Sequence, residues 1–352
     1  YDSIGNRLTA ESGLGAGRER IDYESNALNQ YELITGGALT NPSYDEDGNL
    51  TGYDKAGTRV QLVFNGENRP RVIAPVTPAP GAMKAEFVYD YLGRRVQKRI
   101  LSWNGSNYQP TAIGLFIYDG WNLLEERDES GASRSHYVYG LDLSGTLQGA
   151  GSIGGLVAGI DHGLGVVHHY FYDASGNVVQ LVDGSDGSVT ASYEYGAYGT
   201  IVSSSGSFAG SNPFRFSTKY LDSETGLYYY GYRYYSPELG RWVSRDPLGE
   251  EGGVNTLAIA GNDLINNYDL FGLFWEWARN GTSAHNAFFK WLEDTHPDGK
   301  EYKYDRALGT LGLSISLNRP DVIDLEQKLV WELKPISHMG GTPADYLQLT
   351  KY

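Results

Sequence analysis

The feature that most constrains the fold is a short motif, Tyr-Asp-x-x-Gly-Asn, which recurs along the chain. Full copies start at Tyr1, Tyr44 and Tyr172, and looser copies start at Tyr53, Tyr89 and Tyr118. Asp and Gly favour tight turns, because the Asp side chain bonds the nearby backbone and Gly tolerates positive φ. We therefore expect each Tyr to end a strand, each Asp-Gly segment to turn the chain, and a second strand to follow.

The copy at Tyr172 predicts a β-hairpin most clearly. Residues 169–172 read His-Tyr-Phe-Tyr before the turn, and residues 178–182 read Val-Val-Gln-Leu-Val after it. Hairpins of this length are too short to bury a face alone, so repeated copies must stack side by side. The composition agrees, since 46 Gly and 28 Tyr suit strands joined by tight turns. The chain has no cysteine, which excludes disulfides, cysteine nucleophiles and Cys-based metal sites.

Charge is distributed unevenly along the chain. The formal net charge is −15 and the pI is about 4.9, which argues against a general nucleic-acid coat. Residues 274–352 contain nine Lys and Arg against eleven Asp and Glu, so nearly all of the acidity lies in the first 273 residues. The sequence shows neither an apolar run of membrane-spanning length nor a signal peptide. Because it opens inside a repeat, we expect it to be a fragment of a longer protein.

A more specific signal lies at residues 213–273. It includes Pro-Phe-Arg-Phe at 213–216, the aromatic run Leu-Tyr-Tyr-Tyr-Gly-Tyr-Arg-Tyr-Tyr at 227–235, and Arg-Asp-Pro-Leu-Gly at 245–249. This segment resembles the Rhs core-associated region, and the repeats resemble the YD repeats of Rhs proteins, teneurins and the C components of insecticidal toxin complexes. The resemblance implies a mainly β fold, with a YD-repeat hairpin shell at 1–212 that is closed by 213–273. An ordinary β-sandwich with Tyr-rich turns is the simpler alternative.

The end of this segment resembles a cleavage boundary. Residues 268–273 read Tyr-Asp-Leu-Phe-Gly-Leu, where the family pattern is Asp-Pro-x-Gly-Leu and Leu270 replaces the usual Pro. The resemblance implies autoproteolysis of the Leu273–Phe274 bond by an aspartyl-protease-like pair, Asp246 and Asp269, with Arg245 beside the first.

Paired carboxylates suit this chemistry. Two carboxylates held close together share one proton, so one can act as base and the other as acid. The alternative is that both are structural turn residues.

The composition changes after Leu273. Ser283 is a candidate N-cap for a helix over residues 284–295, where apolar residues recur at helical spacing. Residues 319–324 and 329–335 predict two strands of a hairpin with a turn around 326–328. Glu332 and Lys334 lie two residues apart and therefore on one face of the second strand, which Asp321 can also reach.

These residues resemble the PD-(D/E)xK nuclease motif, which implies a small α/β restriction-endonuclease-like toxin domain over 274–352. In that reading Asp321 and Glu332 bind Mg²⁺ (or Mn²⁺), and Lys334 orients the attacking water. Gln348 starts a Gln-Leu-x-x-Tyr segment that resembles a helix of such toxin nucleases, and the domain is then incomplete at Tyr352. An additional acidic ligand is also expected, and the candidates are Glu293 and its alternatives Glu276, Glu301 and Asp305.

The resemblance as a whole implies a polymorphic toxin. Its shell encapsulates a metal-dependent nuclease and cleaves itself to release it, with DNA favoured over RNA as the substrate. Expected partners are a cognate immunity protein and the spike or adaptor proteins of a secretion system. Such a toxin leaves a bacterial producer and acts in the cytoplasm of a target cell. The alternatives are a YD-repeat adhesin or wall-associated binding protein with a non-nuclease tail, and a tail that attacks another cellular target.

Overall fold

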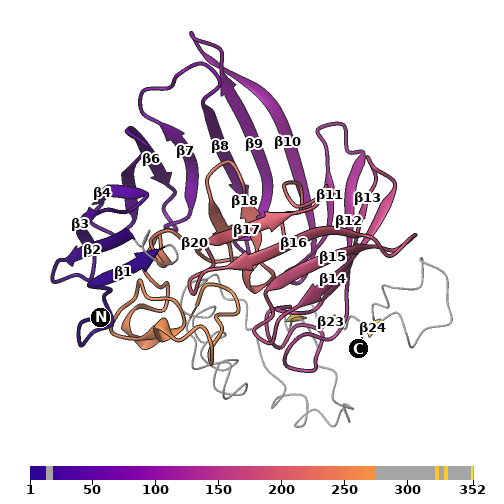
Figure 1. Ribbon diagram of the computed structural model, residues 1–352. Helices are drawn as coiled ribbons and strands as arrows, with labels where there is room; N and C mark the ends of the chain where they lie inside the picture. The colour runs from indigo at the N-terminus through magenta and orange to yellow at the C-terminus, as the bar shows by residue number, and fades with distance from the viewer. Residues whose placement is uncertain (13–18, 274–321, 325–328, 332–349, 352) are drawn as a thin grey trace. The chain divides into compact units, whose positions relative to one another are not determined.

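The computed structural model describes residues 1–12, 19–273, 322–324, 329–331 and 350–351 (Figure 1). The chain divides into two units, Tyr1–Arg279 and Asn280–Tyr352, and each is described by itself. The described part of the first unit is built from antiparallel strands and short 3₁₀ turns, which confirms the mainly β fold.

Three sheets make up the first unit, and neighbouring strands in each sheet are consecutive in the sequence. The first sheet contains β1 (Thr9–Ser12), β2 (Glu19–Ser25) and β3 (Tyr31–Thr35). The large 14-stranded sheet contains β4 (Leu39–Tyr44), β5 (Leu50–Lys55), β6 (Thr58–Phe64), β7 (Pro70–Pro75), β8 (Met83–Tyr89), β9 (Arg95–Trp103), β10 (Tyr108–Asp119), β11 (Asn122–Arg127), β12 (Ser133–Tyr139), β13 (Leu156–Asp161), β14 (Val166–Tyr172), β15 (Val178–Asp183), β16 (Val189–Tyr195) and β17 (Ile201–Ser205). The third sheet contains β18 (Tyr220–Asp222), β19 (Leu227–Tyr229), β20 (Tyr234–Ser236) and β21 (Arg241–Trp242), and the 3₁₀ turns are η2 (Phe216–Thr218), η3 (Gly249–Gly252) and η4 (Ala260–Asn262).

The repeat motif makes one recurring turn. In the copy after β4, Asp45 Oδ1 accepts the Asn49 N–H at 2.8 Å, and Asp45 Oδ2 accepts from the Asn49 side-chain amide at 3.0 Å. Gly48 between them has φ +83°, a conformation that favours glycine. The Asn49 amide also donates to Asn68 Oδ1 at 2.8 Å, which ties one hairpin turn to the next. This geometry explains why Asp, Gly and Asn recur at these positions.

The predicted position of the repeat Tyr is confirmed at Tyr44, Tyr89 and Tyr172, each of which ends a strand. The prediction is wrong for Tyr118, because β10 continues to Asp119, and for Tyr53, because β5 continues to Lys55. There the turn uses Ala56 and Gly57, both at positive φ, so the strand gains two residues before the chain reverses.

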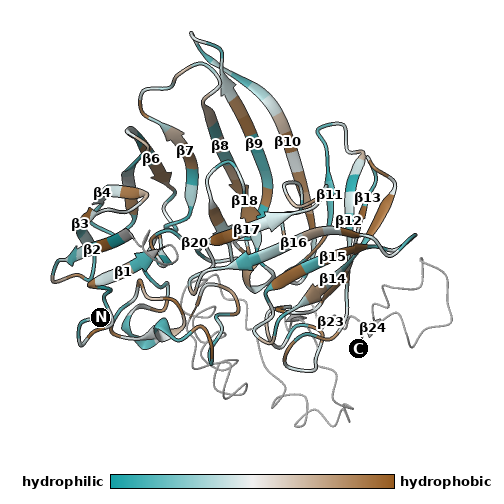
Figure 2. Cartoon of the chain, viewed as in Figure 1, coloured by the Kyte–Doolittle hydropathy of each residue, from teal (hydrophilic) through white to brown (hydrophobic). Residues whose placement is uncertain are grey.

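The third sheet packs against the large sheet and shares its core. Phe87 on β8 lies 5.5 Å from the ring of Tyr234 on β20, and Phe116 on β10 lies 5.7 Å from the ring of Tyr220 on β18. Figure 1 shows β18 and β20 against the curved large sheet, and Figure 2 shows apolar residues interspersed with polar ones along its strands. The strands of the third sheet therefore pack on the buried face of the large sheet.

A buried ion pair joins these two sheets. The guanidinium of Arg95 on β9 donates to Asp222 on β18, and both side chains are fully buried. Lys98 Nζ bonds the second Asp222 oxygen at 3.0 Å. The rings of Phe116 and Tyr229 lie 4.8 and 4.7 Å from the Arg95 guanidinium carbon. A polar link inside an aromatic core fixes the register between the two sheets, because any shift leaves a buried charge unpaired.

The second unit contains the predicted hairpin. Strands β22 (Val322–Asp324) and β23 (Leu329–Trp331) pair antiparallel, with Val322 opposite Trp331. The prediction that Gln348 begins a helix is wrong at its described residues, because β24 (Thr350–Lys351) is a strand that pairs with β23. Thr at position 350 favours a strand, and its pairing with Val330 satisfies the backbone there.

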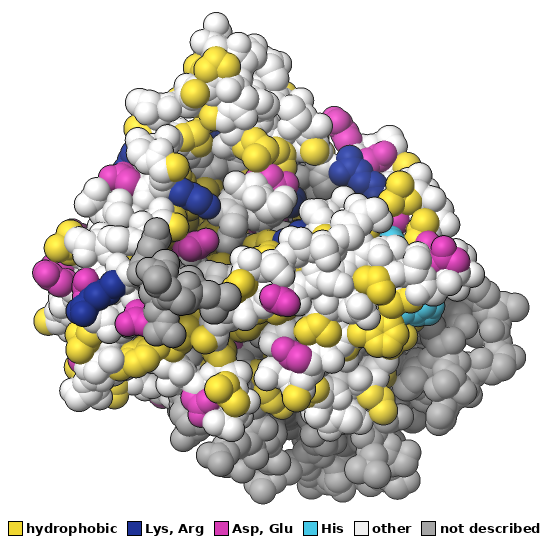
Figure 3. Space-filling model, in the orientation of Figure 1, with side chains coloured by type: hydrophobic (Ala, Val, Ile, Leu, Met, Phe, Trp, Pro, Cys, Tyr) yellow, Lys and Arg dark blue, Asp and Glu magenta, His cyan; other side chains and the backbone are white. Residues whose placement is uncertain are grey.

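Surface charge follows the composition. Figure 3 shows acidic side chains spread over the visible face and basic ones in isolated spots. In the part of the chain that the structure describes, none of the helices has the length and apolar character needed to cross a membrane.

Candidate self-cleavage site

Asp246 lies in the turn after β21. Its Oδ1 accepts the Leu248 N–H at 2.9 Å, and its own N–H donates to Thr256 O at 3.1 Å. The carboxylate is 7% exposed. A Cβ at Gly252 would lie 2.9 Å from Asp246 Oδ2, so the glycine leaves space for this oxygen. The turn therefore holds one oxygen by the backbone and directs the other into the protein.

Asp269 holds the predicted boundary directly. Its Oδ1 accepts the N–H groups of Gly272 at 2.8 Å and Leu273 at 2.9 Å. Gly272 has φ +75°, and a Cβ there would lie 3.0 Å from the backbone nitrogen of Arg233, so the position favours glycine on two counts. Asp269 and Leu273 are each 3% exposed. The carboxyl is thus bound to the residue whose carbonyl belongs to the expected scissile bond.

Arg233 brings the two carboxylates together. Its Nη2 lies 2.7 Å from Asp246 Oδ2 and 3.5 Å from Asp269 Oδ2. Its Nε donates to Gly272 O, and its Nη1 donates to Thr256 O at 2.9 Å. One buried guanidinium therefore contacts both aspartates and the boundary backbone.

The side chain of Arg245, the cation predicted beside Asp246, lies against another turn. Arg245 lies over the turn at Gly48, where an added Cβ would be 2.3 Å from its Nε. Arg233, which the sequence analysis left without a role, supplies the cation instead. The available signal was its place in the aromatic run 227–235, because an arginine buried among aromatic residues needs an acidic partner.

Burial makes protonation of the pair favourable. Burial, opposed by Arg233 and aided by the nearby Asp246, raises the pKa of Asp269 to about 7. Burial also raises the pKa of Asp246, although Arg233 and the Leu248 amide favour its ionised form. The site can therefore hold a protonated Asp269 beside an ionised Asp246, the arrangement needed for acid and base roles.

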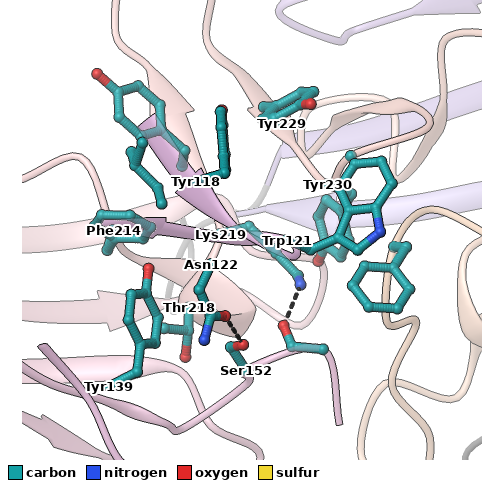
Figure 4. Close-up of a pocket in the computed structure, with 15 residues that line it drawn as sticks. Tyr118, Trp121, Asn122, Tyr139, Ser152, Phe214, Thr218, Lys219, Tyr229 and Tyr230 are labelled. Atoms are coloured by element: carbon teal, nitrogen blue, oxygen red, sulfur yellow. Dashed lines mark hydrogen bonds between the residues drawn. The ribbon is translucent and has the colours of Figure 1, made fainter. Parts of the chain in front are cut away.

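A pocket lies beside the boundary segment (Figure 4). Trp121, Lys219, Tyr230 and Phe271 are among its lining residues. The ring of Phe271 lies 5.5 Å from that of Trp121, and the Tyr232 N–H donates to Phe271 O at 2.9 Å. A ring contact with Trp121 and a backbone hydrogen bond from Tyr232 therefore both hold Phe271, which lies two residues before Leu273.

A family model described as Teneurin YD-shell matches residues 155–268. This range covers β13 to β21, which include the third sheet, and Asp246. Residues 155–268 resemble a YD shell. Asp246 and Arg233 lie inside this range, and Asp269 is the residue directly after it.

Relatives that match this chain are named for different activities. The tRNA3(Ser)-specific nuclease WapA of Bacillus spizizenii is 28% identical over 304 residues, which is 82% of this chain and 11% of that protein. Double-stranded DNA deaminase toxin A of Burkholderia cenocepacia is 27% identical over 233 residues, 63% of this chain and 16% of that protein. The chain therefore spans a small fraction of the relatives that it matches.

Among solved structures, the crystal structure of TcdB2-TccC3-Cdc42 matches with a TM-score of 0.49 and 19% identity. The match covers 72% of this chain and 15% of that one.

The predicted nuclease residues lie outside the described residues. These are Asp321, Glu332, Lys334, Gln348 and Glu293 with its alternatives, together with the helix over 284–295 and Phe274. Within the described ranges, His, Asp and Glu side chains form no group of three that could hold a metal ion.

Proposed function

We propose that this chain is part of a polymorphic toxin whose YD shell cleaves its own Leu273–Phe274 bond and so frees the segment that follows. The observation that carries the proposal is the joining of Asp246 and Asp269 by Arg233, with Asp269 bonded to the Gly272 and Leu273 amides. A structural turn carboxylate needs none of these shared contacts.

The chemistry divides between the two carboxylates. Asp246, bonded by Arg233, takes a proton from a water molecule whose oxygen adds to the Leu273 carbonyl carbon. Asp269 donates its proton to the carbonyl oxygen. The Leu273–Phe274 bond then breaks, the Phe274 nitrogen takes the proton held by Asp246, and the new carboxyl returns a proton to Asp269. Water is consumed and both carboxyls regain their starting states.

The rate of cleavage should fall as the pH rises through about 7, because Asp269 must be protonated and its pKa is about 7. Above this pH we expect the cleavage rate to fall in proportion to the fraction of Asp269 that stays protonated, as for the loss of a single proton. The chain is refolded from urea at a series of pH values, and the cleaved fraction is followed by gel electrophoresis. A rate that is constant from below pH 7 to above it would contradict the proposed role of Asp269.

We further propose that the released segment is an enzyme that acts on nucleic acid, with a metal-dependent nuclease as the favoured form. Two relatives are named as a tRNA nuclease and a DNA deaminase, which supports nucleic acid as the substrate class. Strands β22 and β23 support the hairpin on which the motif was predicted. Asp321 and Glu332 would hold Mg²⁺, which supplies an activated water at a phosphodiester. An immunity protein and delivery into a target cell belong to the same proposal.

Plasmid DNA and tRNA should be cleaved by the full chain with Mg²⁺ but not with EDTA. Asp321→Ala and Lys334→Ala should lower the rate about 10²-fold or more, because each removes a group needed for the hydrolytic step. Asp324→Ala is the matched control and should retain activity. Deamination without strand cleavage would replace the nuclease assignment and keep the nucleic-acid substrate.

A further inference from the structure

Lys219 is a buried cation without an ion-pair partner among the described residues. Its Nζ donates to two backbone carbonyls instead, Leu270 O at 2.6 Å and Gly151 O at 2.9 Å. Figure 4 shows one of these two bonds. The side chain is 7% exposed, and its Nζ lies 5.3 Å from the centroid of the Tyr230 ring. Buried lysines are rare because desolvation of the ammonium is costly. The placement therefore calls for a reason beyond packing.

The two carbonyls join separate parts of the fold. Gly151 belongs to the loop between β12 and β13, and Leu270 follows Asp269 directly. The two backbones touch, since a Cβ at Gly151 would lie 2.6 Å from Leu270 O. Lys219 itself follows Thr218, whose Oγ1 donates to Gly176 O at 2.8 Å. The ammonium group thus fixes the start of the boundary turn to the wall of the shell.

We infer that Lys219 is a positioning residue for self-cleavage, which binds Leu270 O so that the Asp269–Leu273 turn stays in its reactive geometry. This inference rests on the proposed self-cleavage. Its cationic charge also acts on the reacting carboxyl, because Asp269 is the acidic group with the largest electrostatic effect on Lys219, ahead of Asp142.

The charged and titratable groups around Lys219 determine its effect on the pH profile. They are Asp269 on the boundary segment, Asp142 in the loop after β12, and Tyr230 after β19. Burial lowers the pKa of Lys219 to about 8, so the ammonium form is present where Asp269 is protonated and where it ionises. Removing this cation makes ionisation of Asp269 harder and should move the alkaline limb of cleavage to higher pH.

The first test compares cleavage of the full chain with Lys219→Met, Lys219→Arg and the exposed control Lys55→Met. Lys219→Met should cleave about 10²-fold more slowly, since small displacements of reacting groups have effects of this size. Its alkaline limb should move upward, whereas Lys219→Arg retains the charge and the wild-type limb. A folded Lys219→Met with a wild-type rate, or with a slower rate and an unmoved limb, would overturn the inference.

A second measurement does not depend on cleavage. In an Asp246→Asn background, Lys219→Met should make amide hydrogen exchange at Gly272 and Leu273 about tenfold faster, because their turn is held less firmly. Unchanged exchange would show that Lys219 does not position the turn. If Asp246→Asn itself cleaves like wild type, the proposed function fails and the role of Lys219 in cleavage falls with it, and the exchange result then shows only whether Lys219 holds the turn.

Discussion

Replacement of Asp246 by Asn should leave the chain uncleaved, with a rate at least about 10³-fold below wild type. A general acid or base contributes about 10² to 10⁴-fold to a reaction rate, and Asp246 is the base in the proposed mechanism. Asn keeps the shape of the side chain, and its carbonyl oxygen can accept from the Leu248 N–H or from Arg233, which keeps its bonds to Gly272 O and Thr256 O. The fold should therefore survive while the proton acceptor is lost. The rate is measured by gel electrophoresis after refolding.

Asp263→Asn is the matched control for this variant. Asp263 lies in the same core-associated segment, and its carboxylate bonds the side-chain amide of Asn266 at the surface. Its replacement should leave the rate unchanged. Equal loss in both variants would mean that cleavage depends on the stability of the segment rather than on Asp246.

The largest expected effect on stability is at Asp222. Asp222→Leu leaves Arg95 buried without its acidic partner, which should lower the free energy of unfolding by about 3–5 kcal/mol. The measurement is urea unfolding in an Asp246→Asn background, so that the chain stays in one piece. The double variant Arg95→Met with Asp222→Leu should recover most of the loss, since no unpaired charge remains.

A surface pair provides the control for the Asp222 measurement. Asp54 and Arg59 lie 3.3 Å apart and are about one third exposed, so Asp54→Leu should cost less than about 1 kcal/mol. Equal losses at Asp222 and Asp54 would show that the buried pair does not hold the two sheets together.

Hairpin turns were predictable because their causes are local. Asp45, Gly48 and Asn49 form the turn among themselves, so the motif alone indicates it. Tyr53 shows the limit of this reasoning, because strand pairing continued to Lys55 and moved the turn. The number of strands in one sheet and the packing of the third sheet depend on contacts far apart in the sequence.

The candidate site was predictable only in part for the same reason. The sequence indicated Asp246 and Asp269 through their resemblance to a boundary, but it did not distinguish Arg245 from Arg233. Which arginine reaches both carboxylates depends on how the chain crosses itself over residues 233–272. Lys219 was missed because a lysine near a surface-like turn has no sequence signal of burial.

Similarity in the first 273 residues does not fix the activity of the segment that follows. Relatives that match this chain are named as proteins with activities as different as tRNA cleavage and DNA deamination. Similarity over these residues therefore does not identify the chemistry of the segment after Leu273, which has to be determined from its own residues.

Intact mass spectrometry of the chain after folding below about pH 7 tests the central claim most directly. The account predicts two products that meet at the Leu273–Phe274 bond, and a single uncut mass for Asp246→Asn and for Asp269→Asn. Cleavage at another bond, or the same two products from either variant, would contradict it.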